Sequence, residues 1–186
     1  MAPDVRVYDL AQRLLECAND RLAETDGGAI DEGNACVITG AIAWDNCLCG
    51  SLNVAITSGF PSSNFPTPSA NTAAQFGAGR CGQPILVFNL TITVLRCVPV
   101  SDEQGNPPPC EALSASALGA VQDAWAVQAG VLCCLQDALR EKDPDTKAPT
   151  LTAFSVQGQD FLGPQGACGG SAMTVQVGLI NRCPCP

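Results

Sequence analysis

The first regular pattern in the chain is a series of apolar residues near its start. Between Val7 and Leu22 they recur at i, i+3, i+4 and i+7, the spacing of one face of a helix. Polar and charged residues occupy the positions between them. Gly27 and Gly28 follow, and glycine at this place favours the end of a helix. The pattern therefore predicts an amphipathic helix that ends shortly before this glycine pair.

A second and longer helix is predicted over roughly residues 111–141. A stripe of large apolar residues at nearly heptad spacing is expected to face the core: Leu118, Val121, Trp125, Leu132, Leu135 and Leu139. Gly119 and Gly130 are weak points at which this helix is expected to bend or split. At about 100° per residue, Cys133 and Cys134 lie well off the stripe, so both are predicted to look outward from the core face.

Alternating apolar and polar residues predict about four strands. The clearest are residues 85–100, "ILVFNLTITVLRCVPV", and 172–180, "AMTVQVGLI". Two shorter ones, at 35–44 and 51–57, flank the turn-like segment 45–50, "DNCLCG". These two are predicted to form a hairpin with a cysteine pair at its tip.

The remaining segments complete a single domain, residues 1–186. Residues 59–84 are predicted to form a long loop, 151–156 a short apolar piece, and 159–170, "QDFLGPQGACGG", a glycine-rich loop. Two amphipathic helices and about four half-buried strands predict an α+β fold. Both helices should pack on one face of a mostly antiparallel sheet with long loops.

Composition narrows the functional classes. The chain has 186 residues, a net charge of −9 and no histidine. An acidic chain does not suit a protein that holds nucleic acid by neutralising phosphates, although it suits one that lets DNA pass without sticking. Without histidine there is no serine or cysteine nucleophile paired with an imidazole base. We therefore expect a protein that is not an enzyme and has no cofactor.

The chain shows no signal for export or membrane insertion. Its start is charged and amphipathic, without the apolar segment of a signal peptide, and runs such as "ILVF" are far too short to span a bilayer. We expect synthesis in a cytosol and no contact with a membrane. The glycine stretches match neither a dinucleotide fingerprint nor a phosphate loop.

Twelve cysteines are the most unusual feature. A strong zinc signal would be two C-x-x-C knuckles, and the chain has none, so no metal site is expected. The C-x-C pairs Cys47/Cys49 and Cys183/Cys185 leave a four-sulfur zinc site open, and redox catalysis is less favoured. Disulfide bonding is the favoured use. The candidates are Cys17, Cys36, Cys47, Cys49, Cys81, Cys97, Cys110, Cys133, Cys134, Cys168, Cys183 and Cys185.

Spacing does not fix the connectivity of these bridges, but it suggests some partners. Cys17 and Cys110 are candidates to bond with Cys133 or Cys134. The terminal C-x-C pair in "NRCPCP", residues 181–186, is expected to pin the C-terminus to nearby loops, with the "NCLCG" hairpin tip one candidate. Bridges in a protein made in a reducing cytosol must close after release from the cell. The cysteines therefore suggest a particle that outlives its host.

Three of the six phenylalanines fall in the predicted loop 59–84: Phe60, Phe65 and Phe76. Disordered loops rarely retain aromatic residues, and aromatic side chains are enriched at protein interfaces. We therefore predict that this loop makes subunit or tube contacts.

Four segments together resemble a known family. They are residues 3–24, "PDVRVYDLAQRLLECANDRLAE", 81–100, "CGQPILVFNLTITVLRCVPV", 120–135, "AVQDAWAVQAGVLCCL", and 175–186, "VQVGLINRCPCP". In these segments the chain resembles cysteine-rich neck proteins of tailed phages that infect actinobacteria. The order of elements is similar to the tail-terminator fold of siphovirus-type phages, two helices against a four-stranded antiparallel sheet.

The resemblance implies a structural virion protein of the neck region, made in the host cytoplasm. Six copies would form a ring that caps the tail tube protein and joins it to the head-side stopper or connector, while DNA crosses the lumen. The cysteine load departs from the general family. Other hypotheses stay open: another neck component such as a stopper or connector, a cysteine-coordinated zinc module, and a secreted cysteine-rich binder.

Overall fold

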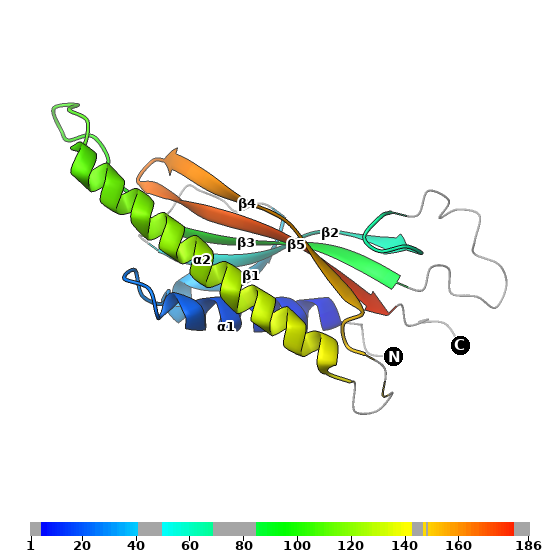
Figure 1. Ribbon diagram of the computed structural model, residues 1–186. Helices are drawn as coiled ribbons and strands as arrows, with labels where there is room; N and C mark the ends of the chain where they lie inside the picture. The colour runs from blue at the N-terminus through cyan, green and yellow to red at the C-terminus, as the bar shows by residue number, and fades with distance from the viewer. Residues whose placement is uncertain (1–4, 41–49, 69–84, 143–146, 148, 181–186) are drawn as a thin grey trace.

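The computed structural model describes residues 5–40, 50–68, 85–142, 147 and 149–180. It shows an α+β protein with two helices and one mixed sheet in the strand order β1-β2-β3-β5-β4 (Figure 1). The elements, in chain order, are α1 (Arg6–Leu22), a short 3-10 turn η1 (Glu32–Asn34), β1 (Ala35–Thr39), β2 (Ser51–Ser62), β3 (Ile85–Cys97), α2 (Cys110–Arg140), β4 (Ala153–Gln165) and β5 (Cys168–Ile180).

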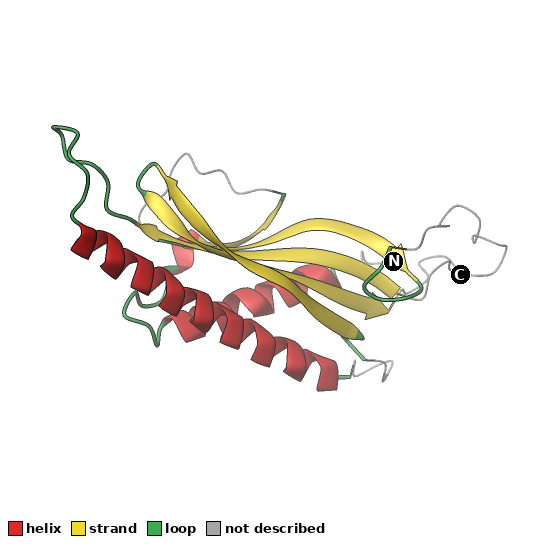
Figure 2. Ribbon diagram, turned by 45° about the horizontal axis from the view of Figure 1, so that its top comes forward, coloured by secondary structure: helices red, strands yellow, loops and turns green. Residues whose placement is uncertain are grey.

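Both helices cover the same face of the sheet (Figure 2). The core lies between the two layers, and apolar residues that alternate along the central strands supply its sheet side. Those residues are Leu52, Val54, Leu90, Ile92, Val94, Met173, Val175, Val177 and Leu179. The predicted α+β fold with two helices on one face is confirmed at this level.

The predicted hairpin between the first two strands is wrong, because β1 and β2 pair in parallel. Their register runs from Ala35 opposite Leu52 to Thr39 opposite Ile56. A tight turn joins only antiparallel strands, and parallel neighbours need a longer connection that returns the chain to the starting end. Local alternation identified both strands but carried no information on their relative direction. The predicted tip, with Cys47 and Cys49, lies outside the described residues.

The sheet has five strands instead of about four, because residues predicted as loop belong to long strands. β4 runs through Gly158, Gly163 and Pro164, and β2 continues to Ser62, into the predicted loop 59–84. β4 is an edge strand with register shifts after Val156 and after Leu162. Edge position and bulges are the settings in which a strand tolerates proline and glycine.

Helix α1 forms as its apolar rhythm predicts, and its buried face follows the i, i+3, i+4 spacing. The buried residues are Leu10, Ala11, Leu14, Leu15, Ala18 and Leu22. Helix α2 also matches its predicted extent and runs unbroken for 31 residues, so the expected split does not occur.

The predicted core face of α2 is wrong for most of its stripe. Leu135 is buried, but Leu118 is 60% exposed and Trp125 68%. The true core face lies to one side and consists mainly of smaller residues: Ala124, Val127, Gly130, Val131, Cys134, Leu135 and Ala138. Cys134 therefore points inward, contrary to prediction, whereas Cys133 is exposed. Small residues line this face because both α1 and the sheet approach it closely.

By length and composition alone, α2 is the one helix among the described residues that is long and apolar enough to cross a membrane. The short apolar runs in the sequence, such as "ILVF", did not indicate this property of α2. The core helix of a soluble protein meets the same criterion, and 39% of the most apolar stretch of α2 is buried within the protein. The observation is weak support for a membrane span.

Gly130 marks the closest approach of the two helices. A Cβ atom added at this position would collide with the backbone carbonyl of Cys17 in α1. At Gly119, in the same helix, an added Cβ would meet nothing within 4 Å. The two glycines that looked alike in the sequence therefore differ in role, because only Gly130 is needed for packing.

We expect Gly130→Ala to destabilise the protein by about 1 to 3 kcal/mol, the usual cost of overpacking against rigid backbone. Gly119→Ala is the matched control, and it should stabilise by up to about 1 kcal/mol through helix propensity. Urea unfolding of both variants under oxidising conditions measures the difference. Equal effects of the two substitutions would contradict the close contact at Gly130.

Candidate interaction surface

The carboxylate of Asp123 fixes α2 in place. It accepts hydrogen bonds from Arg96 Nε of β3 (2.8 Å) and from Thr25 Oγ1, just after α1 (3.0 Å). Arg96 Nη2 also donates to the carbonyl of Gly28 (2.6 Å). The side chain of Asp123 is 4% exposed and that of Arg96 22%. One buried ion pair therefore ties α2 to the end of a central strand and to the segment after α1.

Replacing Asp123 by Asn should destabilise the fold by about 2 to 3 kcal/mol, because Arg96 then keeps its charge without a counter-ion. The control is Asp137→Asn, which removes an exposed ion pair with Arg140 in the same helix and should change stability by less than about 0.5 kcal/mol. Chemical denaturation compares the two. Equal stability losses would contradict an anchoring role for Asp123.

A disulfide between Cys17 of α1 and Cys134 of α2 joins the two helices, with a Cα–Cα distance of 6.3 Å. This is one of the pairings that the sequence left open. Cys97 and Cys168, cross-strand neighbours in β3 and β5, also take part in disulfide bonds. Closing a loop of 117 residues restricts the unfolded chain strongly, so the bridge between the helices is expected to contribute several kcal/mol, about 2 to 5.

Three cysteines in the described part of the chain are free and exposed: Cys36, Cys110 and Cys133. Cys36 donates its thiol to Asn53 Oδ1 (2.9 Å). Cys110 was a candidate partner of the vicinal pair, and it stays unbonded here. No group of three or more His, Cys, Asp or Glu residues among the described ones is placed to hold a metal ion.

The other five candidate cysteines, Cys47, Cys49, Cys81, Cys183 and Cys185, lie outside the described residues. The zinc hypothesis and the predicted anchoring of the C-terminus therefore stay predictions. The described residues next to the two C-x-C pairs are at opposite ends of the sheet. Ser51, at the start of β2, lies opposite Leu95 of β3, and Leu95 lies opposite Gly170 of β5. Ile180, the last described residue before the second pair, is ten residues further along β5.

Peptide mapping of native, non-reduced protein tests the bonding pattern. After alkylation we expect label on Cys36, Cys110 and Cys133, and none on Cys17, Cys97, Cys134 or Cys168. A linked peptide containing Cys17 and Cys134 is the specific positive result. Full labelling of Cys17 and Cys134 without a reductant would show that the helices are not bridged.

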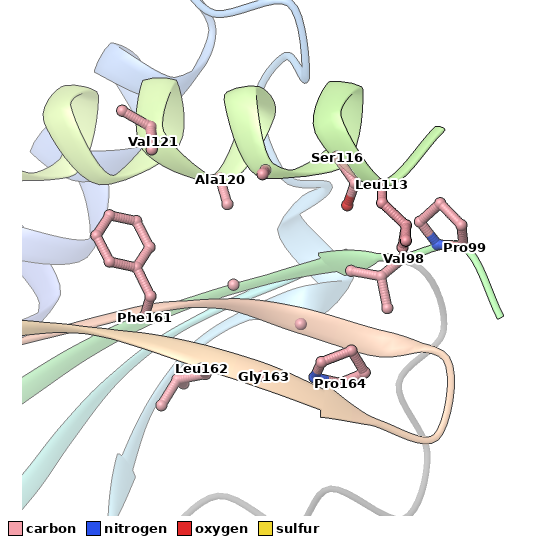
Figure 3. Close-up of a pocket in the computed structure, with 13 residues that line it drawn as sticks. Val98, Pro99, Leu113, Ser116, Ala120, Val121, Phe161, Leu162, Gly163 and Pro164 are labelled. Carbon is pink, nitrogen blue, oxygen red and sulfur yellow. The ribbon is translucent and has the colours of Figure 1, made fainter. Parts of the chain in front are cut away.

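The N-terminal half of α2 projects with little cover. None of its residues from Cys110 to Gln122 is buried. Between this half and the β4–β5 hairpin lies an apolar groove of about 400 Å³ (Figure 3). Leu113 and Val121 line it from the helix, and Phe161 and Pro164 line it from β4. Its lining contains no charged side chain, so the groove suits apolar groups and not charged ones.

A second apolar feature runs along the outer side of α2. We call it the α2 seam; it consists of Leu118, Val121, Trp125, Leu132 and Leu139. Four of these residues are exposed, and Leu132 is partly buried. The seam is the heptad-like stripe predicted from the sequence without Leu135, and it faces away from the core. Exposed apolar surface of this kind marks interaction sites in soluble proteins.

The face of the sheet opposite the helices is polar at its centre, and we call this the polar sheet face. Thr91 of β3 lies opposite Thr174 of β5, with their hydroxyl oxygens 3.5 Å apart. Asn89 donates to Ser58 Oγ (2.7 Å), and Gln176 is its neighbour on β5. The residue alternation places all of them away from the core residues of the same strands.

Charge is almost absent from this sheet. The five strands carry two charged residues, Arg96 and Asp160. Arg96 points to α2, where it binds Asp123, and Asp160 lies opposite Ala172 on the polar sheet face. The polar sheet face in the described strands therefore presents one carboxylate and no lysine or arginine.

The predicted aromatic contacts are only partly visible. Phe60 belongs to β2, opposite Val87, and is partly buried. Phe65 follows β2 and packs against Gly178 of β5 within its own chain, and it is also partly buried. Phe76 lies outside the described residues. Contact of these side chains with a partner stays a prediction.

Titratable groups with shifted pKa values lie at the surface. A hydrogen bond from Arg13 (2.6 Å) lowers the pKa of Glu141, and hydrogen bonds from the side chain and backbone of Asn106 lower that of Asp102. A lowered pKa makes a carboxylate a weaker base, so neither group suits proton transfer near neutral pH. The expectation that the chain is not an enzyme stays a prediction.

Two charged residues in the sequence indicated the anchor of α2, although hydrophobic periodicity did not identify it. Asp123 interrupts the apolar helix, and Arg96 lies near the end of the strongest strand, which together suggest a buried pair. The groove had no signal, because Phe161 and Pro164 lie in a segment that resembled a loop. The chain matches no protein-family model, and a search of curated proteins also gave no match.

Proposed function

We propose that the protein is a structural subunit of a tailed-phage particle, of the tail-terminator type. Six copies would form a ring at the head-side end of the tail tube, stop its growth and join it to the connector, while DNA passes through the lumen. The proposal combines the sequence resemblance with the two-helix α+β fold.

The polar sheet face is the observation that carries the proposal. Lysine and arginine bind phosphates, so a channel wall rich in them would retain DNA. A densely acidic wall would instead repel it. In a chain of net charge −9, this face has one carboxylate and no cation among the described strands. Such a surface suits passage of DNA without binding.

The apolar features of α2 support an assembly role. The groove and the α2 seam leave large side chains such as Trp125 and Phe161 more than half exposed. Free monomers rarely expose connected apolar surface of this extent unless it is used for contacts. These surfaces are suited to contacts with partners.

Native mass spectrometry should give a mass of about 115 kDa, six times the 19.1 kDa chain, or twice that mass where two rings pair, without bound metal. Added to polymerising tail tube protein, the assembly should shorten the tubes by capping them. A stopper or connector would leave tube length unchanged. A monomer with stoichiometric zinc would contradict the ring and favour the metal-binding module.

A charge variant tests the channel wall. Gln176→Lys places a cation on the polar sheet face, and six copies would place six cations around the lumen. The ring should then retain duplex DNA at low salt and release it at high salt. The control, Asp137→Lys, changes the charge at an exposed site on α2 and should retain less DNA. Equal retention by both variants would contradict a lumen position for this face.

A further inference from the structure

We infer that the α2 seam is a site for a second copy of this chain, which pairs with it through its own α2 in antiparallel orientation. The spacing of the seam residues supports this pairing. Leu118, Trp125, Leu132 and Leu139 are each seven residues apart, and Val121 lies beside them. Sustained heptad spacing of large apolar residues is the pattern by which one helix packs along another. Helix α1 is not the partner of the seam, because it packs mainly on a different side of α2 and only its C-terminal end, at Arg21, borders the seam near Trp125.

The orientation of the α2 seam leaves it largely open within the monomer. Gly130 and Cys134 face α1, and Val127, Val131 and Ala138 belong to the core. The seam lies on a third side, where Trp125 is 68% exposed and Leu118 60%. It spans about 32 Å along the helix from Leu118 to Leu139.

The surroundings of the α2 seam favour self-association. In heptad terms its flanking positions on one side are Gln122, Ala129 and Gln136, none of them charged. Two copies of a chain with net charge −9 repel each other over most of their surface. The strip on α2 itself is uncharged, and the charges at its edge beside Trp125 are of both signs: Arg21, Glu24 and Asp26, which accepts a hydrogen bond from Gln122 (3.2 Å). A second copy therefore meets the strip without a row of like charges.

No other described helix surface fits the α2 seam as well as a second α2. The exposed side of α1 carries charged residues, among them Asp9, Glu16, Asp20 and Arg21. Packing them on Leu118 and Trp125 would bury charge without partners, at a cost of several kcal/mol per ion. A second α2 offers only apolar and amide side chains in the same strip.

The arrangement of residues favours the antiparallel orientation. The large apolar residues are symmetric about the point between Gln128 and Ala129. An antiparallel partner therefore places Leu118 opposite Leu139 and Trp125 opposite Leu132. The two Gln128 amides meet next to the two-fold axis, where a single polar position can fix the register. A two-fold contact uses the same patch on both copies and closes on itself.

The available area suffices for a specific contact. The α2 seam and the adjoining Phe161 expose apolar surface on the order of 500 Å² per copy, judged from typical side-chain areas. A pair would then bury about 1,000 Å² of apolar surface, which is the lower end for specific interfaces. Flanking glutamines add to this total.

This contact does not rest on the proposed ring. Neighbours in a six-fold ring meet head to tail, through two different patches, whereas the α2 seam joins copies in pairs. A ring built on other surfaces can be paired with a second ring through its α2 seams. An experiment that contradicts one of the two proposals therefore leaves the other standing.

The first test is a charge substitution in the α2 seam. Trp125→Glu should weaken pairing at least ~30-fold, the loss expected for a central aromatic at an interface. Val100→Glu is the control, since Val100 is 53% exposed and lies outside the seam. Mass by light scattering over a dilution series should halve for Trp125→Glu only. Unchanged thermal unfolding confirms that both variants fold, and equal masses would overturn the inference.

The result also separates the two proposals. If wild-type protein is a pair that Trp125→Glu converts to monomers, the α2 seam is confirmed and the ring is contradicted. If wild-type protein is a six-chain ring that neither variant changes, the ring is confirmed and the α2 seam is overturned.

Cross-linking tests the orientation. Both chains used carry Cys36→Ser and Cys133→Ser; one keeps Cys110, and the other has Cys110→Ser with Gln128→Cys. Antiparallel pairing predicts a linked peptide joining two copies at position 128 and none at position 110, identified by mass spectrometry. A link at Cys110 would show parallel pairing, and no link in either chain would also overturn the inference.

Discussion

The buried ion pair between Asp123 and Arg96 is the interaction on which the arrangement of α2 depends. It joins the middle of the longest helix to a central strand, and Thr25 adds the segment after α1. After Asp123 in the sequence, α2 is held against α1. Gly130 allows the two helices to approach closely, and the Cys17–Cys134 disulfide links them. Before Asp123, none of the helix residues is buried. The anchor therefore divides α2 into a half that belongs to the core and a half that projects.

The exposed apolar surface begins on the projecting half, at the groove and Leu118, and continues along the outer side of α2 past the anchor to Trp125 and Leu139. A helix that continues past its anchor cannot bury both of its apolar sides against one sheet, so the groove beside Phe161 and the α2 seam stay open. The opposite face of the sheet has the reverse character, polar and nearly without charge. These surfaces are features of a molecule that works through contacts with other molecules, which agrees with the proposed role in a particle.

Local sequence pattern predicted the elements better than their partners. The rhythm of α1 and the extent of α2 follow from the chain itself, because helical hydrogen bonds are local. The core face of α2 did not follow, because large residues such as Trp125 form the more obvious stripe, while small ones such as Ala138 fit the narrow space beside α1 and the sheet. The parallel pairing of β1 with β2 and the strand around Pro164 depend on distant neighbours, which no local pattern contains.

The central claim is that the outer side of α2 is covered when the protein assembles. Iodide quenching of Trp125 fluorescence tests it most directly, in a Trp44→Phe chain where Trp125 is the remaining tryptophan. In the single chain this side chain is 68% exposed. At concentrations where the protein is assembled, the account predicts that iodide quenches Trp125 weakly and that dilution restores quenching. Quenching as strong as that of free tryptophan at every concentration would contradict the account.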